Sequence, residues 1–164
     1  MTYPAYTAHQ NSNRPAPREW VLIANSSRAR LFERDPDNGA MRELAAFVQP
    51  SARERGTALA DDRPGQTMKG VARTQYEPHT DPHEREQRRF AHDLAHRLEE
   101  GALGHRMGAL VVFASDPFLG MLRAEFGHAA RVLPGKHVPR DLTTFQGADL
   151  EHRVTEALGS PVDS

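Results

Sequence analysis

Two short, wholly apolar runs are the clearest pattern along the chain. Residues 20–24 read Trp-Val-Leu-Ile-Ala, and residues 109–114 read Ala-Leu-Val-Val-Phe-Ala. Runs of this length without a polar position are typical of strands that are buried on both faces of a sheet. We therefore predict two central strands that lie side by side.

The segments after the first run predict two more strands. Residues 28–33 alternate partly between polar and apolar positions and follow a turn of asparagine and serines, which favours a hairpin. Residues 35–39 form a dense turn signal, and residues 41–48 follow as the third strand of an antiparallel set. One face of this third strand is predicted to carry Leu44, Ala46 and Val48.

The strongest helical pattern spans residues 83–100. Apolar side chains recur there at spacings of three and four, and charged residues occupy the other positions. These apolar side chains are Phe90, Ala91, Leu94, Ala95 and Leu98. Gly101 and Gly104 are the predicted stop signals of this helix.

Three elements are predicted after the second apolar run. A helix is expected to begin with Asp116 as its cap and to end at Gly127, and residues 130–133 predict a short last strand. A four-residue spacing of apolar side chains predicts a C-terminal helix that contains Leu150, Val154 and Leu158. The pattern as a whole predicts an α/β fold with a mixed five-stranded sheet and helices packed on it.

The chain length of 164 residues is that of one domain. We predict a disordered tail at residues 1–18, a single α/β domain at 19–158 and a frayed end at 159–164. Residues 49–81 are rich in Pro, Gly, Arg and Asp and predict a long polar loop before the first long helix. Loops longer than roughly 15 residues are uncommon in compact domains and are either functional or disordered, and both readings stay open.

Composition limits the environment and the chemistry. The chain has no cysteine, which excludes disulfides, thiolate metal sites and thiol catalysis. No stretch predicts a signal peptide or a membrane span, so we expect a cytoplasmic protein without a membrane partner. Lys and Arg total 21 against 22 Asp and Glu, so the chain lacks a general basic field. We therefore expect no DNA partner. No Gly-rich phosphate loop is present in the sequence, so we expect no cofactor. The oligomeric state stays open.

A family resemblance rests on five segments and their order. These are residues 20–24, 28–32, 62–65 (Asp-Arg-Pro-Gly), 90–91 (Phe-Ala) and 114–120 (Ala-Ser-Asp-Pro-Phe-Leu-Gly). This succession resembles the bacterial host attachment protein family over about residues 20–154. Proteins of that family are similar to the middle domain of eukaryotic and archaeal class-one peptide-release factors, which implies the same order of hairpin, long loop, long helix and apolar strand.

The resemblance implies a candidate catalytic tip. In the release-factor domain, the loop before the long helix carries a Gly-Gly-Gln tip that promotes hydrolysis of the peptidyl-tRNA ester. Here Gly65 and Gln66 match that tip, whereas Pro64 replaces its first glycine. Proline cannot reproduce the positive φ that a Gly-Gly pair can adopt. The alternative reading is an ordinary Pro-Gly turn.

Basic residues around this tip form a candidate RNA-binding surface. The loop contributes Arg63, Lys69 and Arg73, and the start of the following helix contributes Arg85, Arg88 and Arg89. One surface of this kind can bind a phosphate backbone, and the resemblance implies the ribosome or tRNA as the partner. Acidic residues lie among these positions, so the alternative is a solvated loop with a salt-bridged helix face.

Three function classes remain. The first is a translation-associated protein that binds the ribosome or tRNA in rescue, hibernation or stress, with peptidyl-tRNA ester hydrolysis as its possible reaction. The second is a non-enzymatic protein–protein interaction protein linked indirectly to host attachment. The third is a metal-dependent hydrolase, because two histidine pairs, His79 with His83 and His92 with His96, have helical spacing. No third ligand is set by spacing, so we assign no metal ligand.

Overall fold

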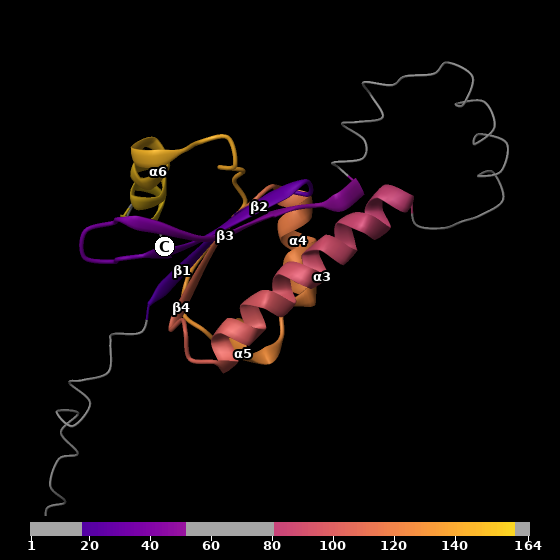
Figure 1. Ribbon diagram of the computed structural model, residues 1–164, viewed down its shortest axis with the longest axis horizontal. Coiled ribbons are helices and arrows are strands. Elements are labelled where there is room, and N and C mark those ends of the chain that lie inside the picture. Colours follow the sequence, from indigo (N-terminus) through magenta and orange to yellow (C-terminus); the bar gives the residue numbers. More distant parts are fainter. Residues whose placement is uncertain (1–17, 52–80, 160–164) are drawn as a thin grey trace, which may run out of the picture.

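A mixed five-stranded sheet forms the centre of the protein (Figure 1). The computed structural model describes residues 18–51 and 81–159. In sheet order the strands are β3 (Met41–Val48), β2 (Arg28–Arg34), β1 (Glu19–Ala24), β4 (Ala109–Ala114) and β5 (His137–Val138). The first three pair antiparallel, whereas β4 is parallel to both β1 and β5. The predicted α/β class with a mixed five-stranded sheet is confirmed.

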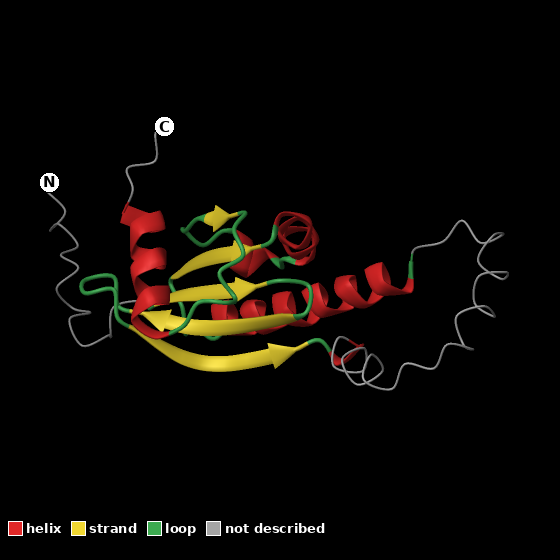
Figure 2. Cartoon of the chain, turned by 90° about the horizontal axis from the view of Figure 1, so that it is seen from above, coloured by secondary structure: helices red, strands yellow, loops and turns green. Residues whose placement is uncertain are grey.

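Helices cover both faces of this sheet. One face carries α3 (Pro82–Leu103), α4 (Asp116–Glu125) and α5 (His128–Arg131), and the other carries α6 (Gly147–Gly159) (Figures 1 and 2). None of the helices in the described ranges is long and apolar enough to cross a membrane. The predicted tail, most of the predicted loop and the predicted frayed end fall on residues 1–17, 52–80 and 160–164, which lie outside the described residues.

The two layers of helices explain why the central strands are apolar throughout. Along β1, Trp20 and Leu22 pack with the α3 side of the core, whereas Val21 and Ile23 pack with the α6 side. The strand β4 alternates in the same way, with Leu110 and Val112 on the α3 side and Val111 and Phe113 on the α6 side. The prediction of two adjacent central strands is confirmed.

The predicted face of β3 is wrong. The pairing of β3 with β2 shifts between Leu31 and Phe32, so that Ala45 and Glu43 pair with them and Leu44 is the extra residue of a bulge. A bulge breaks the two-residue alternation on which the prediction rested. The side chains that pack towards α3 are Leu44, Ala45 and Phe47, while Val48 is 58% exposed.

The long helix α3 is confirmed, with a different end from the one predicted. Its start is capped by Asp81, whose side chain accepts a hydrogen bond from the His83 amide at 3.1 Å. The five apolar residues that define its predicted stripe are all buried. Gly104 is the C-cap, but Gly101 lies inside the helix, where an added Cβ would lie 2.4 Å from Cζ3 of Trp20. Gly101 therefore permits close packing rather than ending the helix.

The segment at residues 130–133 is not a strand. Residues 128–131 form the short helix α5, and the fifth strand is β5 instead. The Glu99 carboxylate of α3 accepts hydrogen bonds from the amides of Ala129 and Ala130, each at 2.9 Å. The first amides of α5 thus find their hydrogen-bond acceptor on another helix. This contact stabilises α5, and the local sequence does not reveal it.

The two remaining helices follow the predicted pattern closely. The helix α4 begins at Asp116, but its N-cap is Ser115, so the prediction of Asp116 as the cap is wrong, and the helix ends at Glu125 rather than Gly127. The C-terminal helix α6 is confirmed, because Leu150 and Val154 are buried and Leu158 is partly buried against the same core.

Candidate functional site

The candidate catalytic tip lies outside the described residues. Gly65 and Gln66 fall within residues 52–80, as do the basic loop residues Arg63, Lys69 and Arg73. Their roles therefore stay predictions from the sequence.

The three helical arginines of the candidate RNA surface are exposed at the start of α3. Arg88 forms an ion pair with Glu84 at 2.8 Å, as the salt-bridged reading of this face expects. Within residues 18–51 and 81–159, Arg85 and Arg89 have no acidic partner. No side chain of α3 before Phe90 is buried, and in Figure 2 these first turns extend past the ends of the strands. The structure thus presents these arginines to solvent on a projecting helix end.

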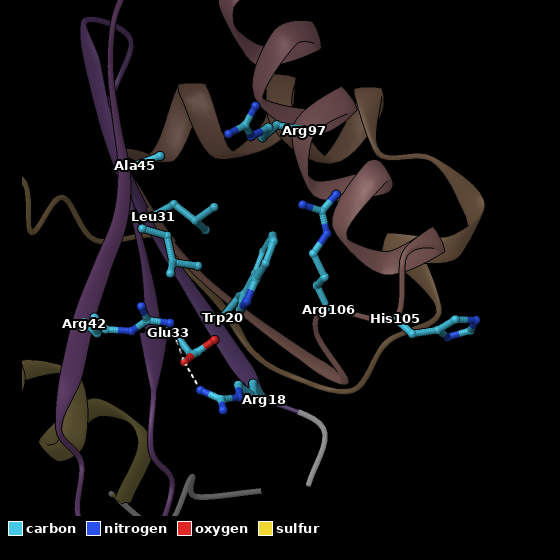
Figure 3. A pocket seen from close by; sticks show the side chains of 10 residues that line it. Arg18, Trp20, Leu31, Glu33, Arg42, Ala45, Arg97, His105 and Arg106 are labelled. Atoms are coloured by element: carbon cyan, nitrogen blue, oxygen red, sulfur yellow. Dashed lines mark hydrogen bonds and ion pairs between the residues drawn. The ribbon is translucent and has the colours of Figure 1, made fainter. Parts of the chain in front are cut away.

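A second basic cluster surrounds a pocket at the opposite end of α3 (Figure 3). The pocket has a volume of about 470 Å³ and lies between the sheet and the end of this helix. We call it the arginine pocket; its lining residues are Arg18, Trp20, Leu31, Glu33, Arg42, Leu44, Ala45, Arg97, His105 and Arg106. Four arginines and one glutamate around an apolar floor make this an anion-attracting site.

Charges in the arginine pocket divide into two groups. Glu33 forms ion pairs with Arg18 and with Arg42, the second at 3.1 Å. Burial raises the pKa of Glu33, but the two arginines outweigh it, so the pKa of this carboxyl lies below its usual value. Arg97 and Arg106 have no acidic partner among the described residues. Two guanidinium groups are therefore available for an external anion.

The close view shows where these side chains point. Arg97 extends from α3 and Arg106 from the loop after it, both towards the space in front of Trp20 and Leu31 (Figure 3). The His105 ring turns away from that space. Leu31 forms part of the apolar floor of the pocket, and Trp20 stands beside that floor with only 6% of its surface exposed.

The end of α3 holds Arg106 in position. The Arg106 amide donates to the Gly101 carbonyl at 2.9 Å, and the His105 amide donates to the Ala102 carbonyl at 3.1 Å. These two bonds form a Schellman motif, in which the position that usually holds glycine has a left-handed backbone. Here that position is His105, with φ of 55°. The motif determines where the backbone of Arg106 leaves the helix.

No sequence pattern points to the arginine pocket. Its charged residues come from the segment before β1, from β2 and β3, and from the end of α3. Glu33 and Arg42 meet because they are cross-strand partners, and Glu33 is also paired with Trp20 across β1. Only the assembled sheet brings these positions together.

His92 and His96 do not form a metal centre with the described residues, and His79 of the other pair lies outside them. His92 contacts Glu125 at 3.0 Å and His96 contacts Glu100 at 3.3 Å, and both rings are exposed. Across residues 18–51 and 81–159, no group of three or more His, Asp or Glu side chains could hold a metal ion. The metal-dependent hydrolase reading therefore gains no site from these residues.

A polar cluster joins the turn after β1 to the loop after β5. The Asn25 Nδ2 donates to Asp141 Oδ2 and to Thr143 Oγ1, each at 3.1 Å, and its Oδ1 accepts from two turn amides. Burial raises the pKa of Asp141, but hydrogen bonds from Thr143 and Asn25 outweigh it and lower the pKa below its usual value. These bonds connect the two loops, so we assign the cluster a structural role.

Comparisons with curated proteins and solved structures add little. No curated protein matches the chain. A solved structure of the Aquifex aeolicus Ppx/GppA phosphatase, a type II variant, is similar at 12% identity over 74% of this chain, with a TM-score of 0.38. The chain spans 35% of the length of that structure, and a likeness this low carries no argument. The release-factor resemblance stays a prediction.

The family itself is shown by sequence. Residues 20–154 match a family of proteins required for attachment to host cells, and these residues make up more than half of the 164-residue chain. The chain therefore belongs to the family of proteins required for attachment to host cells.

Proposed function

We propose that this protein is translation-associated and binds the ribosome or tRNA, in a rescue, hibernation or stress role. The observation that supports this proposal is the projecting start of α3. None of its side chains before Phe90 is buried, and three of these residues are exposed arginines. Helices in proteins gain most of their stability from a buried apolar face. About two turns of α3 lack such a face, and we infer that they contact a partner.

The chemistry of this helix end fits a phosphate backbone. Three arginines outnumber the two glutamates between residues 82 and 89. Arginine presents a planar set of N–H donors that matches phosphate oxygens. The preceding segment adds Arg63, Lys69 and Arg73 on the evidence of sequence. The proposed RNA surface combines these two groups of basic residues.

Co-sedimentation with purified ribosomes at low and moderate salt tests this surface. We expect the wild-type chain to sediment with ribosomes and to be released as salt rises, because phosphate contacts displace counterions. Changing the three helical arginines to glutamine (R85Q/R88Q/R89Q) should lower the salt dependence of binding by roughly 2 to 3 in the slope of log affinity against log salt. The loop variant R63A/K69A/R73A should weaken binding in the same way.

A matched control changes three exposed arginines that lie elsewhere. The variant R123Q/R140Q/R153Q removes the same charge from α4, the loop after β5 and α6. Its ribosome binding should equal that of the wild type. The absence of co-sedimentation at every salt concentration would contradict the proposal, and so would an equal loss of binding in the control variant.

We propose hydrolysis of the peptidyl-tRNA ester as a separate activity of Gly65 and Gln66. A glutamine beside the ester can orient water and stabilise developing charge without an ionisable base. Q66A should lower the hydrolysis rate by about 10² to 10³, the usual effect of losing one such donor, whereas P64G should raise it by restoring a Gly-Gly pair. Release of labelled peptide from peptidyl-tRNA measures both; an unchanged rate in Q66A removes Gln66 from the mechanism.

A different observation favours the second candidate, a protein–protein interaction role. In the described sheet β3 is an edge strand, and a groove of about 530 Å³ lies between it and α3. Exposed Val48 and the neighbouring Phe47 contribute to its lining. A peptide strand can add to such an edge. Binding of a protein partner that survives nuclease treatment would distinguish this role from RNA binding.

A further inference from the structure

We propose that the arginine pocket binds a small organic phosphate. Its phosphate would lie between Arg97 and Arg106, and its apolar part would lie over Leu31, Leu44 and Ala45. This site is distinct from the proposed RNA surface, because Arg97 lies about 12 Å of helix beyond Arg89 and Arg106 lies past the end of α3. Each of the two proposals can therefore be tested independently of the other.

Charge is the first argument. Glu33 is the single acidic residue of the lining and already pairs with Arg18 and Arg42. Arg97 and Arg106 reach the same space without an acidic partner among the described residues. Arginine–phosphate hydrogen bonds are charge-assisted and frequently bidentate, so two guanidiniums can surround one phosphate group.

Shape is the second argument. A volume of about 470 Å³ lies within the usual range of small-molecule sites, roughly 300 to 1,000 Å³. The floor consists of Leu31, Leu44 and Ala45, and the β3 bulge places the last two on the same side of the strand. A purely inorganic ion would leave this apolar floor uncovered. The combination favours a phosphate ester that has a hydrocarbon portion.

Backbone strain at the rim is the third argument. His105 adopts φ of 55°, which an L-residue tolerates less well than glycine. The strained turn determines where Arg106 leaves the helix, through the bond from its amide to the Gly101 carbonyl. Non-glycine residues in the left-handed region occur preferentially where a structure positions a functional group. The turn is thus consistent with Arg106 as a ligand-binding residue.

Trp20 provides a direct readout of this pocket. It is the only tryptophan of the chain and lines the arginine pocket, so tryptophan fluorescence, excited where tyrosine does not absorb, reports on this site. The full chain is titrated with inorganic phosphate, with n-butyl phosphate and with n-butanol, and calorimetry repeats each titration. We expect butyl phosphate to change the fluorescence and to bind at least about tenfold more tightly than phosphate, because several CH₂ groups become buried. Butanol should not bind.

Variants identify the residues that hold the phosphate. R97Q and R106Q should each weaken butyl phosphate binding by roughly tenfold or more, which is typical for a lost charged hydrogen bond. The control R123Q/R140Q removes the same charge from two exposed positions outside the pocket lining, in α4 and in the loop after β5, and should bind as the wild type does.

Three outcomes would overturn the proposal. The first is the absence of both a fluorescence change and a heat signal with butyl phosphate at millimolar concentration. The second is wild-type affinity in the folded R97Q/R106Q double variant. The third is equal affinity for phosphate and butyl phosphate, which would remove the apolar floor from recognition. Thermal unfolding of each variant verifies that it is folded.

Discussion

Replacing Gly135 with alanine is expected to destabilise the fold by about 3 kcal/mol or more, as the sum of backbone strain and overpacking. Gly135 has φ of 144°, and an added Cβ would lie 1.8 Å from the Leu110 carbonyl oxygen. That oxygen belongs to the central strand β4, which cannot move aside without disturbing the sheet. The flanking residues Pro134 and Lys136 accept hydrogen bonds from β4 amides at 2.9 Å each, so displacing Gly135 would weaken both.

Urea unfolding of G135A against the wild type measures this loss. Gly120 is the matched control, because it lies in α4 and an added Cβ there would meet no atom within 4 Å. G120A should be neutral or stabilising by up to about 1 kcal/mol, since alanine is the better helix former. A free energy of unfolding for G135A within about 1 kcal/mol of the wild-type value would contradict the close approach of residues 134–136 to β4.

Replacing Phe113 with alanine is expected to lose about 3 to 5 kcal/mol of stability. Phe113 is fully buried in β4, on the side of the sheet that α6 covers. Its ring belongs to the same apolar cluster as Leu150 and Val154, the two buried residues of α6. Alanine would leave a cavity beneath this helix, so we expect α6 to open more readily than α3.

Two measurements separate the global effect from the local one. Urea unfolding gives the total loss, with F113L as a control that fills most of the volume and should cost less. Hydrogen exchange in F113A should show the larger fall in protection for the amides of Leu150 and Val154, compared with those of Leu94 and Leu98 in α3. Equal loss in both helices, or a total below about 1.5 kcal/mol, would contradict the assignment of Phe113 to the α6 layer.

Elements with a local cause are predictable from the sequence. Spacing predicts the two apolar runs, the hairpin, the long helix and the C-terminal helix. A helix or strand that buries one face repeats its apolar residues with the period of that element, wherever it lies in the fold. The α/β class follows from their order. The fifth strand shows the limit of this reasoning, since residues 130–133 have a strand-like pattern and residues 128–131 nevertheless form α5.

The sequence-based predictions are wrong where a residue distant in the sequence determines the local structure. Glu99 of α3 accepts hydrogen bonds from the amides at the start of α5, and Trp20 of β1 occupies the space beside Gly101. The bulge at Leu44 depends on how β3 pairs with β2. None of these contacts has a signal within a window of neighbouring residues, so propensity and periodicity cannot reveal them.

The sequence by itself determined the first four strands, the helices α3, α4 and α6, and the family, because those depend on local patterns and motif order. It also supplies Gly65 and Gln66 as candidate residues, which stay predictions. Tertiary structure alone decided that Arg97 and Arg106 share a pocket with Glu33 and Trp20. Cross-strand register and the closing turn of α3 place these residues together, and both are properties of the assembled sheet. A pocket made from separate segments exists only once packing has brought them into contact.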